Sequence, residues 1–70
     1  MDGWAETTFC VNEAGKPEQI RVSVSSGMSM LDAQAIKDAE LSKFRPGTLD
    51  GQPTRMCGVR LVFRYSEWSR

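Results

Sequence analysis

The fold is decided by the stretch Ser25–Pro46, which reads Ser-Ser-Gly-Met-Ser-Met-Leu-Asp-Ala-Gln-Ala-Ile-Lys-Asp-Ala-Glu-Leu-Ser-Lys-Phe-Arg-Pro. This segment is the one that reads strongly as helix, because its apolar residues recur at helical spacing. Those residues share one face: Leu31, Ala35, Ile36, Ala39 and, past the end, Phe44. Ser29 or Asp32 is expected to cap the start of the helix, and Pro46 cannot continue it. The stripe of mostly small side chains predicts a helix that lies close against a sheet.

Both flanks of this helix show the two-residue alternation of β-strands. We expect a first strand over Glu6–Asn12 and a second over Gln19–Ser25, joined by a hairpin turn at Gly15. A third strand, the longest, is predicted over Arg55–Tyr65. Between the helix and this strand, Asp50-Gly51 indicates a tight turn, and the proline two residues later is expected to keep the segment irregular.

The predicted order is strand, strand, helix, strand, which assigns the chain to the α+β class. A right-handed crossover through the helix carries the third strand past the second and pairs it with the first. The result is a three-stranded antiparallel sheet of order 2-1-3 with one helix packed on one face, a β-β-α-β unit whose third strand is a free edge. The expected core consists of Phe9, Val11, Ile20, Val22, Val24, Leu31, Ala35, Ile36, Ala39, Phe44, Val59, Leu61 and Phe63.

Length and composition exclude several classes of function. The 70 residues make one small domain over 1–70, with an ordered core expected at about 6–65. A formal net charge of zero argues against nucleic acid as a partner, since phosphate binding needs clustered positive charge. The chain has no histidine, and its two cysteines do not make a zinc site by themselves. We therefore expect no metal, no cofactor and no enzyme activity. No apolar run approaches the roughly 20 residues of a membrane-spanning helix.

The order of these segments resembles the C-terminal domain of TonB-family energy transducers, over about residues 7–65. The resemblance is carried by Phe9–Gly15, Ile20–Gly27, Leu31-Asp32 with Ala35, Ile36 and Ala39, then Phe44-Arg45-Pro46, Gly51-Gln52-Pro53 and Val59–Phe63. No single motif among these is specific by itself, whereas the ordered series at this spacing is.

The resemblance implies a periplasmic domain of a Gram-negative bacterium that follows an inner-membrane helix and a Pro-rich spacer. In such proteins, inner-membrane motor proteins driven by proton motive force pull on the domain. The domain binds the TonB box, a short peptide of an outer-membrane active transporter, as an extra strand beside its third strand. The implied partner-binding residues are Arg55, Met56, Gly58, Val59, Arg60, Leu61, Val62, Arg64 and Tyr65. The membrane helix and the spacer are not among the 70 residues. If the natural protein also lacks them, only the binding function carries over; otherwise the domain is expected to pass on the pull as well.

A free edge strand binds extended peptides because its outward backbone donors and acceptors have no partner. The arginines on or beside the third strand, Arg55, Arg60 and Arg64, have two compatible interpretations. They attract an acidic peptide, or they guard the edge against aggregation. Free edges also permit a homodimer by edge pairing or swapping.

Cys10 and Cys57 are the two cysteines, and an oxidising periplasm permits a disulfide between them. Their strands are predicted neighbours, which favours the bond. Strand alternation argues against it, because Cys10 is out of phase with Phe9 whereas Cys57 is in phase with Val59. A bulge at Gly58 would bring the cysteines into phase, so the sequence leaves the disulfide open.

Two other functions stay open at this level. A domain of the TolA type has a similar fold and binds different envelope proteins. A stand-alone secreted domain with a structural or inhibitory role belongs to another class. Trp4 and Trp68 either pack across the ends of the sheet or contact a partner.

Overall fold

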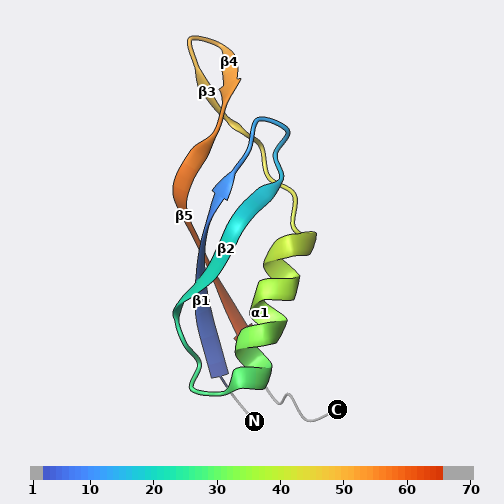
Figure 1. Ribbon diagram of the computed structural model, residues 1–70, viewed down its shortest axis with the longest axis vertical. Helices are drawn as coiled ribbons and strands as arrows, with labels where there is room; N and C mark the ends of the chain where they lie inside the picture. The colour runs from blue at the N-terminus through green and yellow to red at the C-terminus, as the bar shows by residue number, and fades with distance from the viewer. Residues whose placement is uncertain (1–2, 66–70) are drawn as a thin grey trace.

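The helix and the strands follow one another in the predicted order (Figure 1). The computed structural model describes residues 3–65 and contains β1 (Gly3–Val11), β2 (Pro17–Val24), α1 (Ser29–Leu41), β3 (Gly47–Leu49), β4 (Gln52–Thr54) and β5 (Met56–Tyr65). An antiparallel three-stranded sheet has the order β2-β1-β5, and β3 pairs with β4 in a separate two-stranded sheet. The α+β class and the strand order 2-1-3 are thus confirmed, with β5 as the third strand. Trp68 lies outside the described residues.

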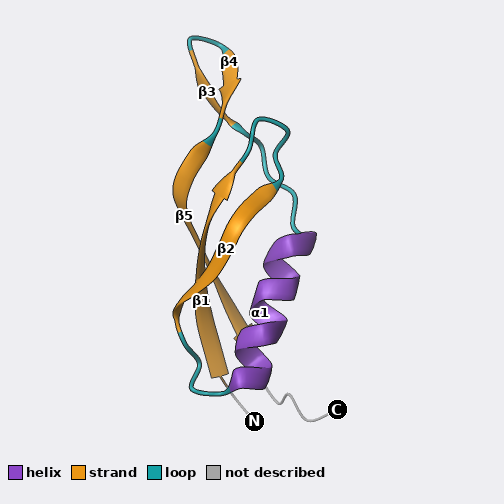
Figure 2. Ribbon diagram, viewed as in Figure 1, coloured by secondary structure: helices purple, strands orange, loops and turns teal. Residues whose placement is uncertain are grey.

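One face of the three-stranded sheet is covered by α1 (Figure 2). The helix packs mainly against β1 and β2 and least against β5. Leu31, Ala35 and Ala39 are fully buried at this interface, as their helical spacing predicts. Two of the three are alanines, and such small side chains let the helix backbone lie close to the sheet. Within residues 3–65, no helix or strand packs on the opposite face, which we call the open face.

The core beneath the helix has two parts that share the side chain of Phe63. The first lies at the start of β1 and consists of Ala5, Leu31, Ala35 and Tyr65. The second lies near the end of β1 and consists of Phe9, Val11 and Ala39, with Phe44 packed against them. Thr7 is buried between the two parts, where its Oγ1 donates a hydrogen bond of 3.2 Å to the carbonyl of Leu61. The buried hydroxyl of Thr7 therefore has a hydrogen-bond partner, as buried polar groups require.

The prediction that Val24 lies in the core is wrong, because β2 carries an irregularity at this point. Glu6 pairs with Val24 while the next residue, Thr7, pairs with Val22, so that Ser23 is an extra residue in β2. Val24 is consequently turned away from the core and is 39% exposed. The hydroxyl of Ser23 donates a hydrogen bond of 3.2 Å to the carbonyl of Glu6, which holds the bulge in place.

The start of α1 is capped differently from the prediction. Met28 occupies the capping position without a side-chain cap, and Ser29 is the first helical residue. Asp32 lies in the first turn and reaches back to Ser26, accepting hydrogen bonds from its N–H at 2.8 Å and its hydroxyl at 2.6 Å. Hydroxyl donors from Ser25 and Ser26 hold the pKa of the Asp32 carboxyl below its usual value. Asp32 therefore fastens the beginning of the loop that follows β2 to the first turn of the helix.

The segment after the helix is regular where we expected irregular chain. β3 and β4 form a hairpin around Asp50 and Gly51, whose φ angles of 51° and 79° are those of a tight turn that matches strand twist. Pro53 pairs with Thr48 in this hairpin. Proline is tolerated here because each strand of a two-stranded sheet has one side without a neighbour. The hairpin projects beyond the end of the larger sheet (Figure 1).

Candidate functional site

The larger sheet has two edge strands, which differ in length and in the regularity of their pairing. β2 forms one edge; it begins at Pro17, carries two register irregularities and lies alongside α1 (Figure 2). β5 forms the other edge; it is ten residues long, and β1 is the one strand of the described residues that pairs with it. Its pairing with β1 is regular over Val59–Tyr65. The long regular edge is the better template for an added strand.

Side chains of β5 alternate between two surfaces over this regular stretch. Arg60, Val62 and Arg64 are exposed on the open face. Val59, Leu61 and Phe63 point to the helix side and are only half-buried. A strand added to this edge would therefore meet a basic surface on one side and half-buried apolar side chains on the other.

Two of the predicted partner-binding residues are engaged within the domain. Tyr65 is buried, and its hydroxyl donates a hydrogen bond of 2.8 Å to Oδ2 of Asp38 on α1. Burial and the neighbouring Asp38 carboxylate raise the pKa of Tyr65 above its ordinary value. Arg55 precedes β5 and forms an ion pair with Glu18 of β2. A hydrogen bond from Asn12 and the Arg55 guanidinium lower the pKa of Glu18.

The beginning of β5 contains a bulge that places the two cysteines together. Phe9 pairs with Val59 and Val11 pairs with Met56, so two steps along β1 match three along β5. Gly58 takes up the extra step with a φ of +76°, a conformation that favours glycine. The bulge reverses the phase of β5, and Cys57 meets Cys10 in a disulfide with Cα atoms 3.9 Å apart.

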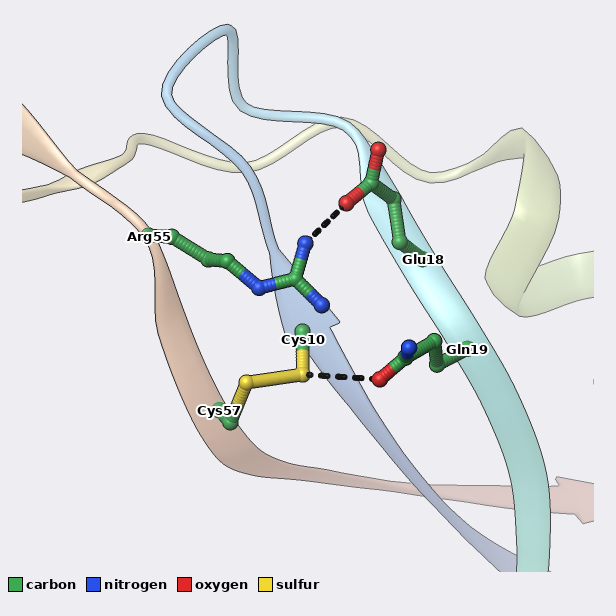
Figure 3. The surroundings of a disulfide bond; sticks show 5 residues. All are labelled: Cys10, Glu18, Gln19, Arg55 and Cys57. Atoms are coloured by element: carbon green, nitrogen blue, oxygen red, sulfur yellow. Dashed lines mark hydrogen bonds and ion pairs between the residues drawn. A yellow bond between two sulfur atoms is a disulfide. The ribbon is translucent and has the colours of Figure 1, made fainter.

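A second bulge lies on the other side of Cys10, in β2. Thr8 pairs with Arg21 and Cys10 with Glu18, and Gln19 has a φ of 54° between them. Oε1 of Gln19 lies 3.7 Å from the Sγ of Cys10 (Figure 3). We read this as a contact, because a disulfide sulfur carries no proton to donate.

The two bulges border a shallow hollow of about 350 Å³, which is lined by Thr8, Phe9, Cys10, Gln19, Arg21, Cys57 and Gly58. Sequence reasoning missed the roles of Gln19 and Glu18 at this place. No signal pointed to them, because the β2 bulge has a glutamine where a glycine would have marked it.

The described residues include no helix long and apolar enough to cross a membrane. Comparison with known proteins gives one family. The family model described as Gram-negative bacterial TonB protein C-terminal matches residues 1–66, a span that includes every described strand and the described helix. No curated protein and no solved structure matches the chain.

Proposed function

The chain belongs to the family of Gram-negative bacterial TonB protein C-terminal domains, and we propose that it binds an extended peptide by strand addition along β5. The peptide is the TonB box of an outer-membrane transporter. The domain acts in the periplasm, where an upstream part of the protein connects it to motor proteins of the inner membrane and passes on their pull. Family membership supports this setting, since the family consists of interaction domains rather than enzymes.

The observation that carries the proposal is the free edge of β5. Residues 59–64 pair regularly with β1 on one side, and within residues 3–65 no strand pairs with their other side. An extended peptide beside them completes a fourth strand through main-chain hydrogen bonds. Because the backbone supplies most of the contacts, one domain can serve several receptor sequences.

The side chains of β5 add a preference to this backbone pairing. On the open face the peptide lies beside Arg60 and Arg64, which favour a carboxylate. On the helix side it lies beside the half-buried Val59 and Leu61, which favour apolar β-branched residues. Of the predicted binding residues, Arg55 and Tyr65 already use their side chains within the domain, in contacts with Glu18 and Asp38. We therefore expect little side-chain contact between these two residues and the peptide.

Affinity in solution should be modest. Each net hydrogen bond contributes about 1 kcal/mol, and ordering the peptide offsets part of the sum. We expect a Kd on the order of micromolar.

A pair of N-methylated peptides tests strand addition directly. Alternate backbone N–H groups of an added strand point toward β5, and the others point to solvent. A TonB-box peptide methylated at the first set should lose binding by at least about tenfold, since several hydrogen bonds are removed. The same peptide methylated at the second set is the matched control and should keep its affinity. Equal affinities for the two peptides in a fluorescence anisotropy titration would contradict strand addition.

A further inference from the structure

The first residues of β5 are attached to the sheet in a different way from the rest of the strand. We call residues 55–58 the leading segment; it precedes or forms the bulge and continues directly from the β3–β4 hairpin. Three interactions of described residues tie it to the sheet. They are the Val11–Met56 backbone pairing, the Arg55–Glu18 ion pair and the Cys10–Cys57 disulfide.

The disulfide is the strongest of these three ties. The Arg55–Glu18 pair is solvent-exposed, and exposed ion pairs contribute little. The Val11–Met56 pairing stands alone beyond the bulge, cut off from the regular ladder that ends at Phe9–Val59. Met56 is itself half-exposed. Without the covalent bond, the leading segment therefore has few contacts that oppose its release.

The remainder of the domain does not depend on the disulfide in the same way. From Gly3–Tyr65 to Phe9–Val59, β1 and β5 pair without a register shift. This ladder lies over both parts of the core, and Tyr65 at its end is fastened to Asp38 of α1. Loss of the disulfide should therefore act locally, on the leading segment and the hairpin that it carries.

The disulfide is also open to chemical attack. Cys57 is an exposed residue, whereas Cys10 is buried, and the hollow between the two bulges borders both. Arg55 lies two residues before Cys57 and forms an ion pair with Glu18, the residue that pairs with Cys10 in β2, so this ion pair belongs to the surroundings of the disulfide (Figure 3). Oε1 of Gln19, 3.7 Å from Cys10 Sγ, lies where it can accept a hydrogen bond from the reduced thiol.

We propose that Cys10–Cys57 is a site of thiol–disulfide exchange with a dithiol partner, and that its reduction releases the leading segment of β5 and weakens peptide capture. A partner thiolate attacks Cys57 Sγ, the S–S bond breaks, and Cys10 leaves as a thiolate that takes up a proton. The second partner thiolate then attacks the mixed disulfide and frees Cys57 as a thiol. Two electrons and two protons pass to this domain, and the partner becomes a disulfide.

The effect on capture rests on the proposed function. In the oxidised domain, a peptide paired with Val59–Tyr65 can continue past the bulge to Met56, because the disulfide holds Met56 at the edge. In the reduced domain that extension is lost. Loss of about one net hydrogen bond corresponds to an affinity roughly five- to tenfold weaker.

The experiment uses the whole chain, oxidised or reduced with dithiothreitol, and measures amide hydrogen exchange and TonB-box peptide affinity on the same samples. Reduction should speed exchange at residues 56–58 by at least about tenfold while Phe63 and Tyr65 change little. Peptide affinity should fall by roughly five- to tenfold. The double variant Cys10→Ser/Cys57→Ser is the matched control, because dithiothreitol cannot change it. It should resemble the reduced protein under both conditions.

Each other outcome has a definite meaning. Unchanged exchange at residues 56–58 on reduction overturns the proposal. Faster exchange throughout the chain also overturns it, because the disulfide would then hold the whole fold. If reduction releases residues 55–58 but the two redox forms bind the peptide equally well, the claim that the disulfide controls peptide capture is overturned. Strand addition along β5 is not affected by that result. If neither form binds the peptide, the proposed function fails, and the exchange data alone decide whether the leading segment is released.

Discussion

Gln19 and Gly58, with φ angles of 54° and 76°, flank the same level of the central strand. Each adds a residue to its own strand, so the sheet is irregular on both sides of Cys10. Of the two, Gly58 was foreseeable, since a glycine within a strand pattern suggests a bulge. Gln19 was not, because glutamine carries no preference for this conformation. The phase conflict between Cys10 and Cys57 in the sequence is explained by the bulge at Gly58.

Tyr65 is the one tyrosine of the chain, so its ionisation can be followed by absorbance without interference from other phenols. Its pKa is raised above the ordinary 10.0 by burial and by Asp38. The folded state thus prefers the neutral phenol. The resulting stability is fully present below pH 10.0 and is lost as the pH rises from there toward the folded-state pKa. We predict tyrosinate formation at higher pH in the native protein than in guanidinium chloride.

Tyr65→Phe should lower the free energy of unfolding by about 1 kcal/mol at neutral pH, because the hydrogen bond to Asp38 is lost. The difference between wild type and variant should shrink above pH 10.0, as the wild type loses its advantage. Urea unfolding at a series of pH values measures both quantities. A difference that grows above this pH would mean that Tyr65 is not held neutral by the fold.

At the scale of elements, alternation and helical spacing predicted the strands of the main sheet and α1 well. Leu31, Ala35 and Ala39 are buried as predicted, and their spacing alone sufficed. The sequence did not predict the β3–β4 hairpin, because a proline at position 53 argues against strand pairing, although Asp50-Gly51 already indicated the turn. Proline excludes a central strand and does not exclude a two-stranded hairpin.

Gly15 joins the β1–β2 turn to the end of the helix region. The N–H of Phe44 donates a hydrogen bond of 3.0 Å to the carbonyl of Gly15, whose φ is 84°. A Cβ at Gly15 would overlap the carbonyl oxygen of Phe44, whereas one at Gly51, with a φ of 79°, meets nothing within 4 Å. Both alanine variants take on backbone strain of about 1–2 kcal/mol, and Gly15→Ala adds the overlap.

We therefore predict that Gly15→Ala lowers the free energy of unfolding by at least about 2 kcal/mol more than its matched control Gly51→Ala. Chemical denaturation of the two variants measures the difference. Similar losses in both would show that the close approach to Phe44 is unimportant for the fold.

We expect Arg60 and Arg64 to oppose the pairing of two β5 edges from separate copies of the chain. If two edges pair antiparallel about Val62, Arg60 of each copy faces Arg64 of the other, and like charges opposite one another are unfavourable. Arg60→Glu replaces this repulsion by attraction on both sides of the pairing. We predict that this variant dimerises more strongly in analytical ultracentrifugation than the wild type, with Arg21→Glu on β2 as control. A wild type that dimerises as strongly would contradict a guarding role for these arginines.

At the scale of the whole molecule, one helix serves a three-stranded sheet and cannot cover it evenly. α1 lies over β1 and β2, so the apolar side chains of β5 are only half-covered, and no second strand of residues 3–65 pairs with this edge. The strand order 2-1-3, and with it the identity of the free edge, was predictable from the right-handed crossover rule. The engagement of Arg55 by Glu18 and of Tyr65 by Asp38 was not, because both pairings join residues far apart in the chain.

The central claim, that peptide adds along β5, is tested most directly by a backbone amide NMR titration of the oxidised chain with a TonB-box peptide. The account predicts that the largest shift changes lie on Val59–Tyr65, with smaller ones on the paired residues of β1 and little change on β2. Changes concentrated on Pro17–Val24 or on Ser29–Leu41 would place the binding site elsewhere. No change at millimolar peptide would contradict peptide capture by this domain.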